Sequence, residues 1–154
     1  MPGTKSILIV GIGNYFCHDD GVGLYIAGKI KTLNLHDVKV IDSLPDCSHL
    51  IETWTGIGKV IVIDAAKSGA DPGHIYRFDA LNENIPEECF ARYSTHMMSI
   101  TETIELAKTL GELPESLIVY GIEGSDFSAG EGLTDAVKNS ADEAIQRIIS
   151  ELQN

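Results

Sequence analysis

Residues 7–30 have the sequence ILIVGIGNYFCHDDGVGLYIAGKI, and this stretch decides the fold of the chain. It opens with an apolar, β-branched run at 7–10, which is typical of a strand buried on both faces. Gly11-Ile12-Gly13-Asn14 then allows the chain to turn sharply off that strand. An apolar stripe follows at steps of three and four residues, which predicts a helix; its members are Val22, Ile26, Ile30 and Leu33.

The same alternation of strand and helix continues through the chain. The predicted strands, each expected to be buried on both faces, are residues 6–11, 38–42, 59–64, 74–79 and 117–122. The other helical stripes are Cys47, Leu50, Ile51 and Trp54; Met97, Ile100, Ile104 and Ala107; and Val137, Ala141, Ile145, Ile148 and Leu152. This order predicts an α/β fold: a three-layer sandwich in which helices cover both faces of a mostly parallel, twisted sheet.

Residues 74–79 are the expected exception to parallel pairing. The stretch from Asp64 to Phe78 is too short to contain a crossover helix, so this strand is predicted to run antiparallel to its neighbour. We see no linker or repeat, and 154 residues suit one core, so residues 1–154 are predicted to form a single domain.

Composition excludes several classes of partner. The formal net charge of −12 repels phosphate backbones and anionic lipid headgroups, which argues against nucleic acid and membrane surfaces. No apolar run approaches the roughly 20 residues of a membrane span, and the first residues lack a signal-peptide pattern. Three widely separated cysteines favour reduced thiols, so we expect a cytoplasmic protein.

The glycine loop also invites a nucleotide-binding interpretation, which the pattern does not complete. A dinucleotide fingerprint needs a third glycine where this chain has Phe16, and no Walker Gly-Lys-Ser or Gly-Lys-Thr occurs. Acidic residues occupy the start of the helix, where a phosphate would sit. A sharp turn is therefore the better interpretation of the glycines.

Potential metal ligands follow three of the predicted strands. Asp19-Asp20 follows the glycine loop, Asp64 directly ends the apolar run 60–63, and His96 opens a helical segment after the strand 74–79. Ligands of open α/β sheets bind at the carboxyl ends of the strands. Two carboxylates and an imidazole converging there predict a divalent metal site formed by Asp20, Asp64 and His96.

Each of these residues also has a purely structural interpretation. An aspartate before a helix caps it, and one aspartate is enough, so we assign Asp19 to capping and Asp20 to the metal. Asp64 is harder to explain structurally, because a half-desolvated carboxylate needs a cation or several N–H donors. His96 follows Ser94-Thr95, either of which could cap the helix that begins near it.

Other metal-site components compete with this set. Cys47-Ser48-His49 stands at another strand end and is the main rival. Cys17, next to His18, could also contribute a ligand. His18 follows Cys17 and precedes the acidic pair, so it could hydrogen-bond to a metal ligand without binding the metal itself. The preferred set suits zinc, nickel, iron or manganese, and three protein ligands leave coordination positions open for water or substrate.

The motifs in this order resemble those of the hydrogenase maturation endopeptidases, which process the large subunit of nickel–iron hydrogenases. The resemblance covers nearly the whole chain and is most specific where Gly13-Asn14 is followed by Asp19-Asp20-Gly21-Val22-Gly23. The remaining motifs are Ile9-Val10-Gly11-Ile12, Asp64-Ala65, Gly69, Pro72-Gly73, Phe78, Ser94-Thr95-His96, Gly121-Ile122-Glu123 and Gly132-Leu133-Thr134.

The resemblance implies a substrate, a metal and site residues. Asp20, Asp64 and His96 match the acidic and imidazole ligands of the family, and they are the catalytic residues that the resemblance implies. The substrate would be a hydrogenase large-subunit precursor that loses a short C-terminal extension after nickel insertion. Nickel would be carried by that precursor, with zinc or cadmium as surrogate ions.

Two questions of mechanism and class stay open at this stage. Either the metal or its bound water acts on the scissile amide, or one carboxylate is the general base while the metal positions the peptide. A non-proteolytic metal-binding or precursor-recognition module, and a small-molecule metal hydrolase, are the alternatives to a protease.

Overall fold

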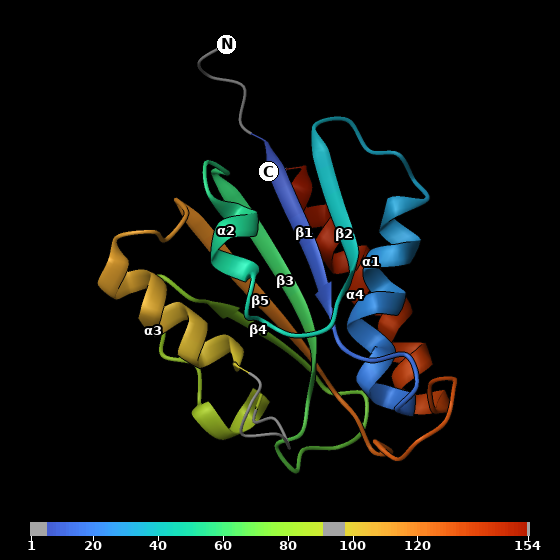
Figure 1. The fold of residues 1–154 in the computed structure, drawn as a ribbon. Coiled ribbons are helices and arrows are strands. Elements are labelled where there is room, and N and C mark those ends of the chain that lie inside the picture. Colours follow the sequence, from blue (N-terminus) through green and yellow to red (C-terminus); the bar gives the residue numbers. More distant parts are fainter. Residues whose placement is uncertain (1–5, 91–97, 154) are drawn as a thin grey trace.

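The computed structural model describes residues 6–90 and 98–153, which build a five-stranded sheet in the order β2-β1-β3-β5-β4 (Figure 1). The strands are β1 (Ile7–Ile12), β2 (Val38–Leu44), β3 (Lys59–Ala66), β4 (Ile75–Asp79) and β5 (Ser116–Glu123). β1 pairs in parallel with β2 and β3, β3 pairs in parallel with β5, and β4 runs antiparallel to β5. The predicted fold class and the single antiparallel strand are both confirmed.

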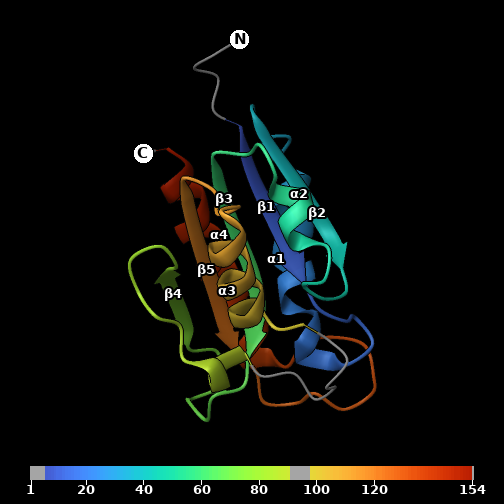
Figure 2. The same cartoon turned by 60° about the vertical axis from the view of Figure 1, so that its left-hand side comes forward.

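Helices cover both faces of this sheet, as Figure 2 shows from the side. The α-helices are α1 (Val22–Lys31), α2 (Leu50–Trp54), α3 (Ile100–Leu110) and α4 (Asp135–Leu152), and the short 3-10 helices are η1 (His18–Gly21) and η2 (Glu87–Phe90). Because strand side chains alternate, β3 sends Val60 and Val62 to a core under α2, α3 and η2. It sends Ile61 and Ile63 to a second core under α1 and α4.

Two details of burial differ from the prediction. The edge strands β2 and β4 are only partly buried, because each has a neighbour on one side alone. Leu33, predicted to complete the stripe of α1, is 49% exposed because the helix ends at Lys31. None of the helices in the described ranges is both long enough and apolar enough to cross a membrane.

The third α-helix begins later than predicted. It starts at Ile100 rather than at His96, and its N-cap is Ser99 rather than Ser94 or Thr95. The Ser99 side chain accepts a hydrogen bond from the Glu102 backbone N–H while the Glu102 carboxylate accepts one from Ser99 N–H. This capping box satisfies two backbone donors of the first turn.

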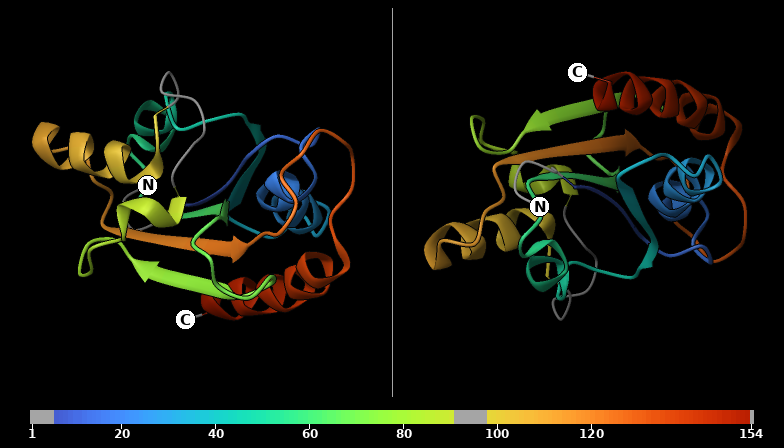
Figure 3. Two further views of the ribbon diagram at one scale, coloured as in Figure 1. Left: turned by 90° about the horizontal axis from the view of Figure 1, so that it is seen from below. Right: turned by 90° about the horizontal axis from the view of Figure 1, so that it is seen from above.

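Close backbone packing explains the glycines at the start of α1. A Cβ added to Gly23 would lie 2.3 Å from the carbonyl oxygen of Ile63 and 2.7 Å from that of Ile12. The start of α1 therefore lies directly on the carboxyl ends of β1 and β3. Four parallel strands end at this edge, which Figure 3 shows from below in its left view and which we call the carboxyl edge.

Candidate functional site at the carboxyl edge

Asp64 lies inside β3 and is fully buried. The sequence predicted that it would end the strand, but β3 continues to Ala66 because Ala65 and Ala66 also pair with β5. Strand alternation places Asp64 on the same face as Val62, beneath η2 and α3. Its Oδ1 accepts a hydrogen bond of 2.8 Å from the N–H of Ala65.

The surroundings of Asp64 exclude bulk water. Asp64 is opposite Gly121 in the β3–β5 register, and a Cβ added to Gly121 would lie 2.6 Å from the Phe90 ring. Phe90 of η2 therefore covers the sheet next to this carboxylate. A carboxylate buried in this way requires compensation by cations or hydrogen-bond donors, as expected from the sequence.

Asp20 lies in η1 and is half-buried. Its N–H donates to the carbonyl of Cys17 at 3.0 Å, and its own carbonyl accepts from the N–H of Asn14 at 3.3 Å. Gly13, at φ 147°, turns the chain here, and a Cβ at this position would lie 2.0 Å from the Asp20 carbonyl oxygen. Because η1 contacts β3, the elements that carry Asp20 and Asp64 meet at the carboxyl edge.

His96 lies outside the described residues, so the three-residue ligand set stays a prediction. The described elements on either side of it, η2 and α3, contact each other, and η2 also contacts β3. Within residues 6–90 and 98–153, no group of three His, Cys, Asp or Glu side chains could hold a metal. The rival set around Cys47 is not assembled: Cys47 is buried, whereas the exposed His49 bonds Glu52 at 2.6 Å.

Asp19 has a structural role, but not the predicted one. Neither η1 nor α1 has a side-chain N-cap, so the assignment of Asp19 to helix capping is wrong. Its fully buried carboxylate instead accepts from the backbone N–H groups of Ser125, Asp126 and Thr134 at 2.8–3.1 Å. The Thr134 hydroxyl donates to it as well. Asp19 thus holds the loop 124–134, which connects β5 to α4.

His18 holds the same loop from the neighbouring position. Its backbone N–H donates to the carbonyl of Gly130 at 2.8 Å, and the Nδ1 atom of its ring lies 2.9 Å from the carbonyl oxygen of Gly132. The backbone of His18 has φ 44°, a conformation rare for a residue with a side chain. Figure 3 (left) shows the consequence: the loop that follows β5 passes around the start of α1.

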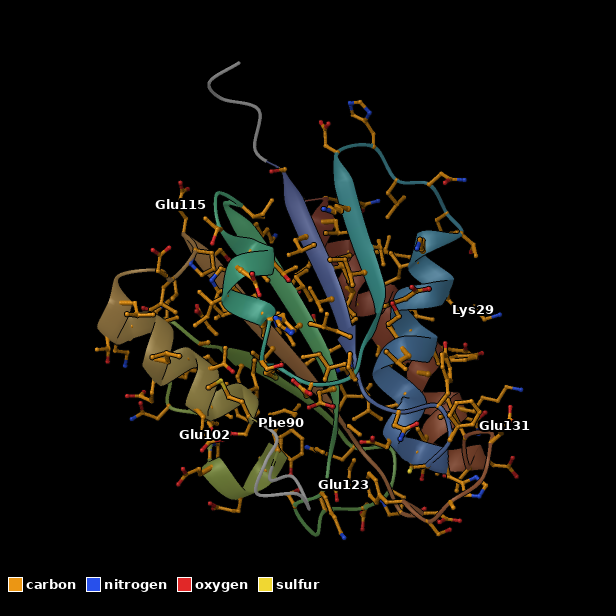
Figure 4. All side chains as sticks on the ribbon, viewed as in Figure 1. Lys29, Phe90, Glu102, Glu115, Glu123 and Glu131 are labelled. Atoms are coloured by element: carbon orange, nitrogen blue, oxygen red, sulfur yellow. The ribbon has the colours of Figure 1, made fainter. Side chains whose placement is uncertain are left out.

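Glu123 is a buried carboxylate at this edge whose role the sequence reasoning missed. It ends β5, is 2% exposed and is labelled in Figure 4. Its oxygens accept from Ser68 N–H at 3.0 and 3.1 Å, from Ser68 Oγ at 2.7 Å and from Gly69 N–H at 3.2 Å. The sequence held a usable signal, because Glu123 follows an apolar strand in the way that drew attention to Asp64.

The buried Cys89 reports on the electrostatics between these carboxylates. Burial, together with the negative charges of Glu123, Asp64 and Glu88, raises the pKa of its thiol from 9.0 to about 11. Cys89 is therefore a neutral thiol at physiological pH and a poor nucleophile. The carboxylates of Asp64 and Glu123 both act on this one side chain, which places the two acidic groups on the same side of the sheet, near η2.

An open groove completes the carboxyl edge. It lies between the loop 67–74, which follows β3, and the loop 124–134, and its volume is about 920 Å³. Lys67, Gly69, Pro72, Glu123, Phe127 and Ser128 are among the residues that line it. The Lys67 ammonium lies 5.5 Å from the centroid of the Phe127 ring, within the range of a cation–π contact.

Solved structures of hydrogenase maturation proteases share this fold. The hydrogenase maturating endopeptidase HybD from Escherichia coli superposes with a TM-score of 0.82 over 97% of this chain and 93% of that chain, at 20% identity. The maturation protease HycI from Thermococcus kodakarensis gives a TM-score of 0.75 over 99% and 96%, at 22% identity. At such identities the superpositions establish the fold.

Sequence comparison extends the likeness beyond the fold. A Methanocaldococcus jannaschii protein named as a hydrogenase maturation protease is 30% identical over 155 residues, covering 97% of both chains. The coenzyme F420 hydrogenase subunit delta of Methanothermobacter thermautotrophicus is 31% identical over 170 residues, covering 99% of this chain and 98% of its own. The HycI family, described as hydrogenase maturation protease, matches residues 25–151. The chain therefore belongs to the hydrogenase maturation protease family, a family of peptidases.

Proposed function

We propose that this protein is an endopeptidase that removes the C-terminal extension from the large-subunit precursor of a nickel–iron hydrogenase after nickel insertion. Membership of the maturation protease family supports the class of reaction and of substrate. The observation that carries the proposal is the fully buried Asp64 at the carboxyl edge, beside the 3-10 helix that holds Asp20. Such burial of a carboxylate is costly and is typical of functional sites.

In this proposal Asp20, Asp64 and His96 bind the nickel that the precursor carries. Two carboxylates and one imidazole suit nickel, and zinc or cadmium would serve as surrogate ions. The carboxylates come from elements that hydrogen bonds hold in place: β3 pairs on both sides, and the backbone of Asp20 bonds Asn14 and Cys17. Three protein ligands would leave positions for the precursor's own ligands.

The chain's own residues would position and hydrolyse the peptide. Phe90 covers Gly121, the register partner of Asp64, and would limit the access of water to that carboxylate. The half-buried Asp20 is more accessible than Asp64, so its carboxylate oxygen that does not bind nickel would accept a proton from the attacking water as general base. That water's oxygen would bond to the amide carbon, the C–N bond would break, and the proton would pass to the departing amine. Nickel would polarise the reacting groups and report that the precursor is loaded.

The thiols of the chain support a non-covalent mechanism. All three cysteines are thiols rather than disulfides, and two of them, Cys47 and Cys89, are buried. Cys89 is held neutral by burial and by its carboxylate neighbours, which raise its pKa to about 11. Reduced thiols also suit a reaction in the cytoplasm.

The proposal is tested by incubating the protein with a nickel-loaded large-subunit precursor and recording the intact masses. The likeness to a protein named as a coenzyme F420 hydrogenase subunit makes the precursor of that hydrogenase class the first to try. Wild-type protein should produce one discrete C-terminal loss. Asp20→Asn, Asp64→Asn and His96→Gln should each slow cleavage at least about a hundredfold while the protein stays folded.

Asp142→Asn is the matched control, because Asp142 is exposed on α4, far along the chain from the proposed ligands. The variant should cleave the precursor at the wild-type rate. Full cleavage by both Asp20→Asn and Asp64→Asn would refute the ligand assignment. A stable complex without cleavage by wild-type protein would instead identify a precursor-recognition module. Neither binding nor cleavage would leave a small-molecule hydrolase as the remaining class.

A further inference from the structure

The two loops that form the walls of the groove are held in place by hydrogen bonds to buried carboxylates. On one side Glu123 accepts hydrogen bonds from Ser68 and Gly69 of the loop that follows β3. On the other side Asp19 accepts them from Ser125 and Asp126 of the loop that follows β5. Loops held in this way lose little conformational entropy when a ligand binds, so the groove is preorganised.

The groove joins directly onto the elements of the proposed active site. Asp19, which holds one wall, is the neighbour of Asp20 in η1. The other wall begins at Lys67, three residues beyond Asp64 on the same strand and loop. The Gly124 N–H also donates to the carbonyl of Ala66 at 3.0 Å, which ties the two walls together at their base. A chain lying in the groove would therefore run next to η1 and β3, the elements that carry Asp20 and Asp64.

The lining of the groove suits a peptide with an apolar side chain. The half-buried ring of Phe127 and the exposed Pro72 supply apolar surface, and the Lys67 ammonium lies over that ring. Gly69 carries no side chain, and no atom lies within 4 Å of the place a Cβ would take there, which leaves room for a backbone to approach that groove wall closely. The volume of about 920 Å³ lies within the range of small-ligand pockets and is large enough for a few residues.

We propose that this groove binds the extended segment of the precursor next to the cleaved bond and seats an apolar side chain of that segment against Phe127 and Pro72. The inference rests on the proposed function and adds to it a substrate-binding surface. Phe127 is then a specificity-determining residue, and Lys67 keeps its ring in place through the cation–π contact.

The kinetic test obstructs the groove without touching the proposed ligands. Ser128 lines the groove, is exposed, and donates its hydroxyl to Asp126 at 2.6 Å. Ser128→Trp should raise KM for the nickel-loaded precursor about tenfold or more with little change in kcat or melting temperature. Ser128→Ala removes the same hydroxyl without filling the groove and should retain the wild-type KM. Ser150→Trp, on the exposed side of α4, is the control for a new surface tryptophan.

Phe127 provides a second, independent readout. Phe127→Ala should raise KM for the precursor. Phe127→Leu should have a KM close to that of the wild type, because leucine keeps an apolar side chain at this position. Melting temperatures separate this effect from loss of fold, since Phe127 also packs on the core beneath α1 and α4. A wild-type KM for both Ser128→Trp and Phe127→Ala would overturn the inference.

Cross-linking identifies the occupant directly. A photoreactive benzoylphenylalanine at position 128 should join to the precursor within a few residues of the cleavage site, and one at position 150 should not. A cross-link to a distant surface of the large subunit, or to a second copy of this chain, would overturn the groove assignment while wild-type cleavage upheld the proposed function. Absence of cleavage by wild-type protein would remove the proposed function and this inference together.

Discussion

At the scale of single residues, the carboxyl edge divides its carboxylates between two tasks. Asp19 and Glu123 are buried and accept several backbone hydrogen bonds from the loops that frame the edge. Asp20 and Asp64 lie beside them on η1 and β3 and are the proposed ligands. The adjacent pair Asp19-Asp20 thus separates structure from function in two neighbouring positions.

This division predicts opposite outcomes for the two aspartates. Asp19→Ala leaves the N–H groups of Ser125, Asp126 and Thr134 without their acceptor, at a cost of about 1–3 kcal/mol for each donor that stays buried. We expect it to lower the free energy of unfolding by about 3 kcal/mol, measured by urea denaturation. Asp20→Asn should change that free energy by less than about 1 kcal/mol while abolishing cleavage. Unchanged stability of Asp19→Ala together with lost cleavage would show that the roles are reversed.

Two glycines of α1 provide a matched pair for the packing at this edge. A Cβ at Gly23 would lie 2.3 Å from the Ile63 carbonyl oxygen, whereas one at Gly28 would have nothing closer than 3.6 Å. Gly23→Ala should therefore lower the free energy of unfolding by about 3 kcal/mol through overpacking against backbone. Gly28→Ala should raise it by about 0.5–1 kcal/mol, because alanine favours the helix. If Gly23→Ala and Gly28→Ala changed the free energy of unfolding equally in thermal or urea denaturation, the close contact of α1 with β3 would be contradicted.

At the scale of elements, local patterns were predictable and distant contacts were not. The five strands and the antiparallel pairing of β4 follow from apolar runs and from the short connection between Asp64 and Phe78. The start of α3 could have been found, because Ser99 and Glu102 have the spacing of a capping box. The loop 124–134 could not, since its hydrogen bond from Thr134 to Asp19 joins residues 115 positions apart.

A polar cluster joins the last helix to the sheet and gives a prediction for this scale. Tyr120 of β5 donates its hydroxyl to Glu151 of α4 at 2.8 Å, and Arg77 of β4 donates to the same carboxylate at 2.6 Å. Tyr120→Phe removes one bond to a charged acceptor, so urea denaturation at neutral pH should show a loss of about 2 kcal/mol. Wild-type stability at neutral pH would indicate that the cluster does not hold α4 to the sheet.

The same tyrosine predicts a pH dependence with a definite sign. Burial, together with the bond to Glu151, raises the pKa of Tyr120 from 10.0 to about 12. A raised pKa gives stability that is complete below pH 10 and is lost as the pH rises toward 12, because the unfolded chain releases its proton first. Phenylalanine has no hydroxyl to ionise, so Tyr120→Phe does not lose this part of its stability at high pH. The difference in the free energy of unfolding between wild type and variant should therefore become smaller above pH 10.

At the scale of the whole molecule, the topology places the candidate site before any side chain is considered. Parallel β1, β3 and β5 bring their carboxyl ends to one edge, so Asp20 and Asp64 could be assigned to that edge from sequence order alone. The partners of Asp19 and Glu123 depend on how two loops fold back over the edge, which no local pattern encodes. The position of His96 stays a prediction, since it lies outside the described residues.

The charge of the whole chain predicts how salt changes its stability. The chain has 23 acidic and 11 basic residues and a net charge of −12, so the compact state carries considerable self-repulsion. The ion pairs that salt weakens most, such as Arg147–Glu143 and Lys108–Glu105, join solvent-exposed side chains and contribute at most about 1 kcal/mol each. Screening by salt should therefore weaken the repulsion between like charges more than it weakens the attraction within ion pairs.

We expect the melting temperature to rise by a few degrees as NaCl increases from about 0.01 M to about 0.15 M, where the Debye length falls from about 30 Å to about 8 Å. Calorimetry in the presence of a chelator keeps divalent ions out of the carboxyl edge. KCl at equal ionic strength should give the same rise, because screening depends on ionic strength and not on the cation. A melting temperature that falls with salt would mean that the attractive pairs outweigh the net charge, and a rise with only one of the two cations would point to specific binding at the acidic edge.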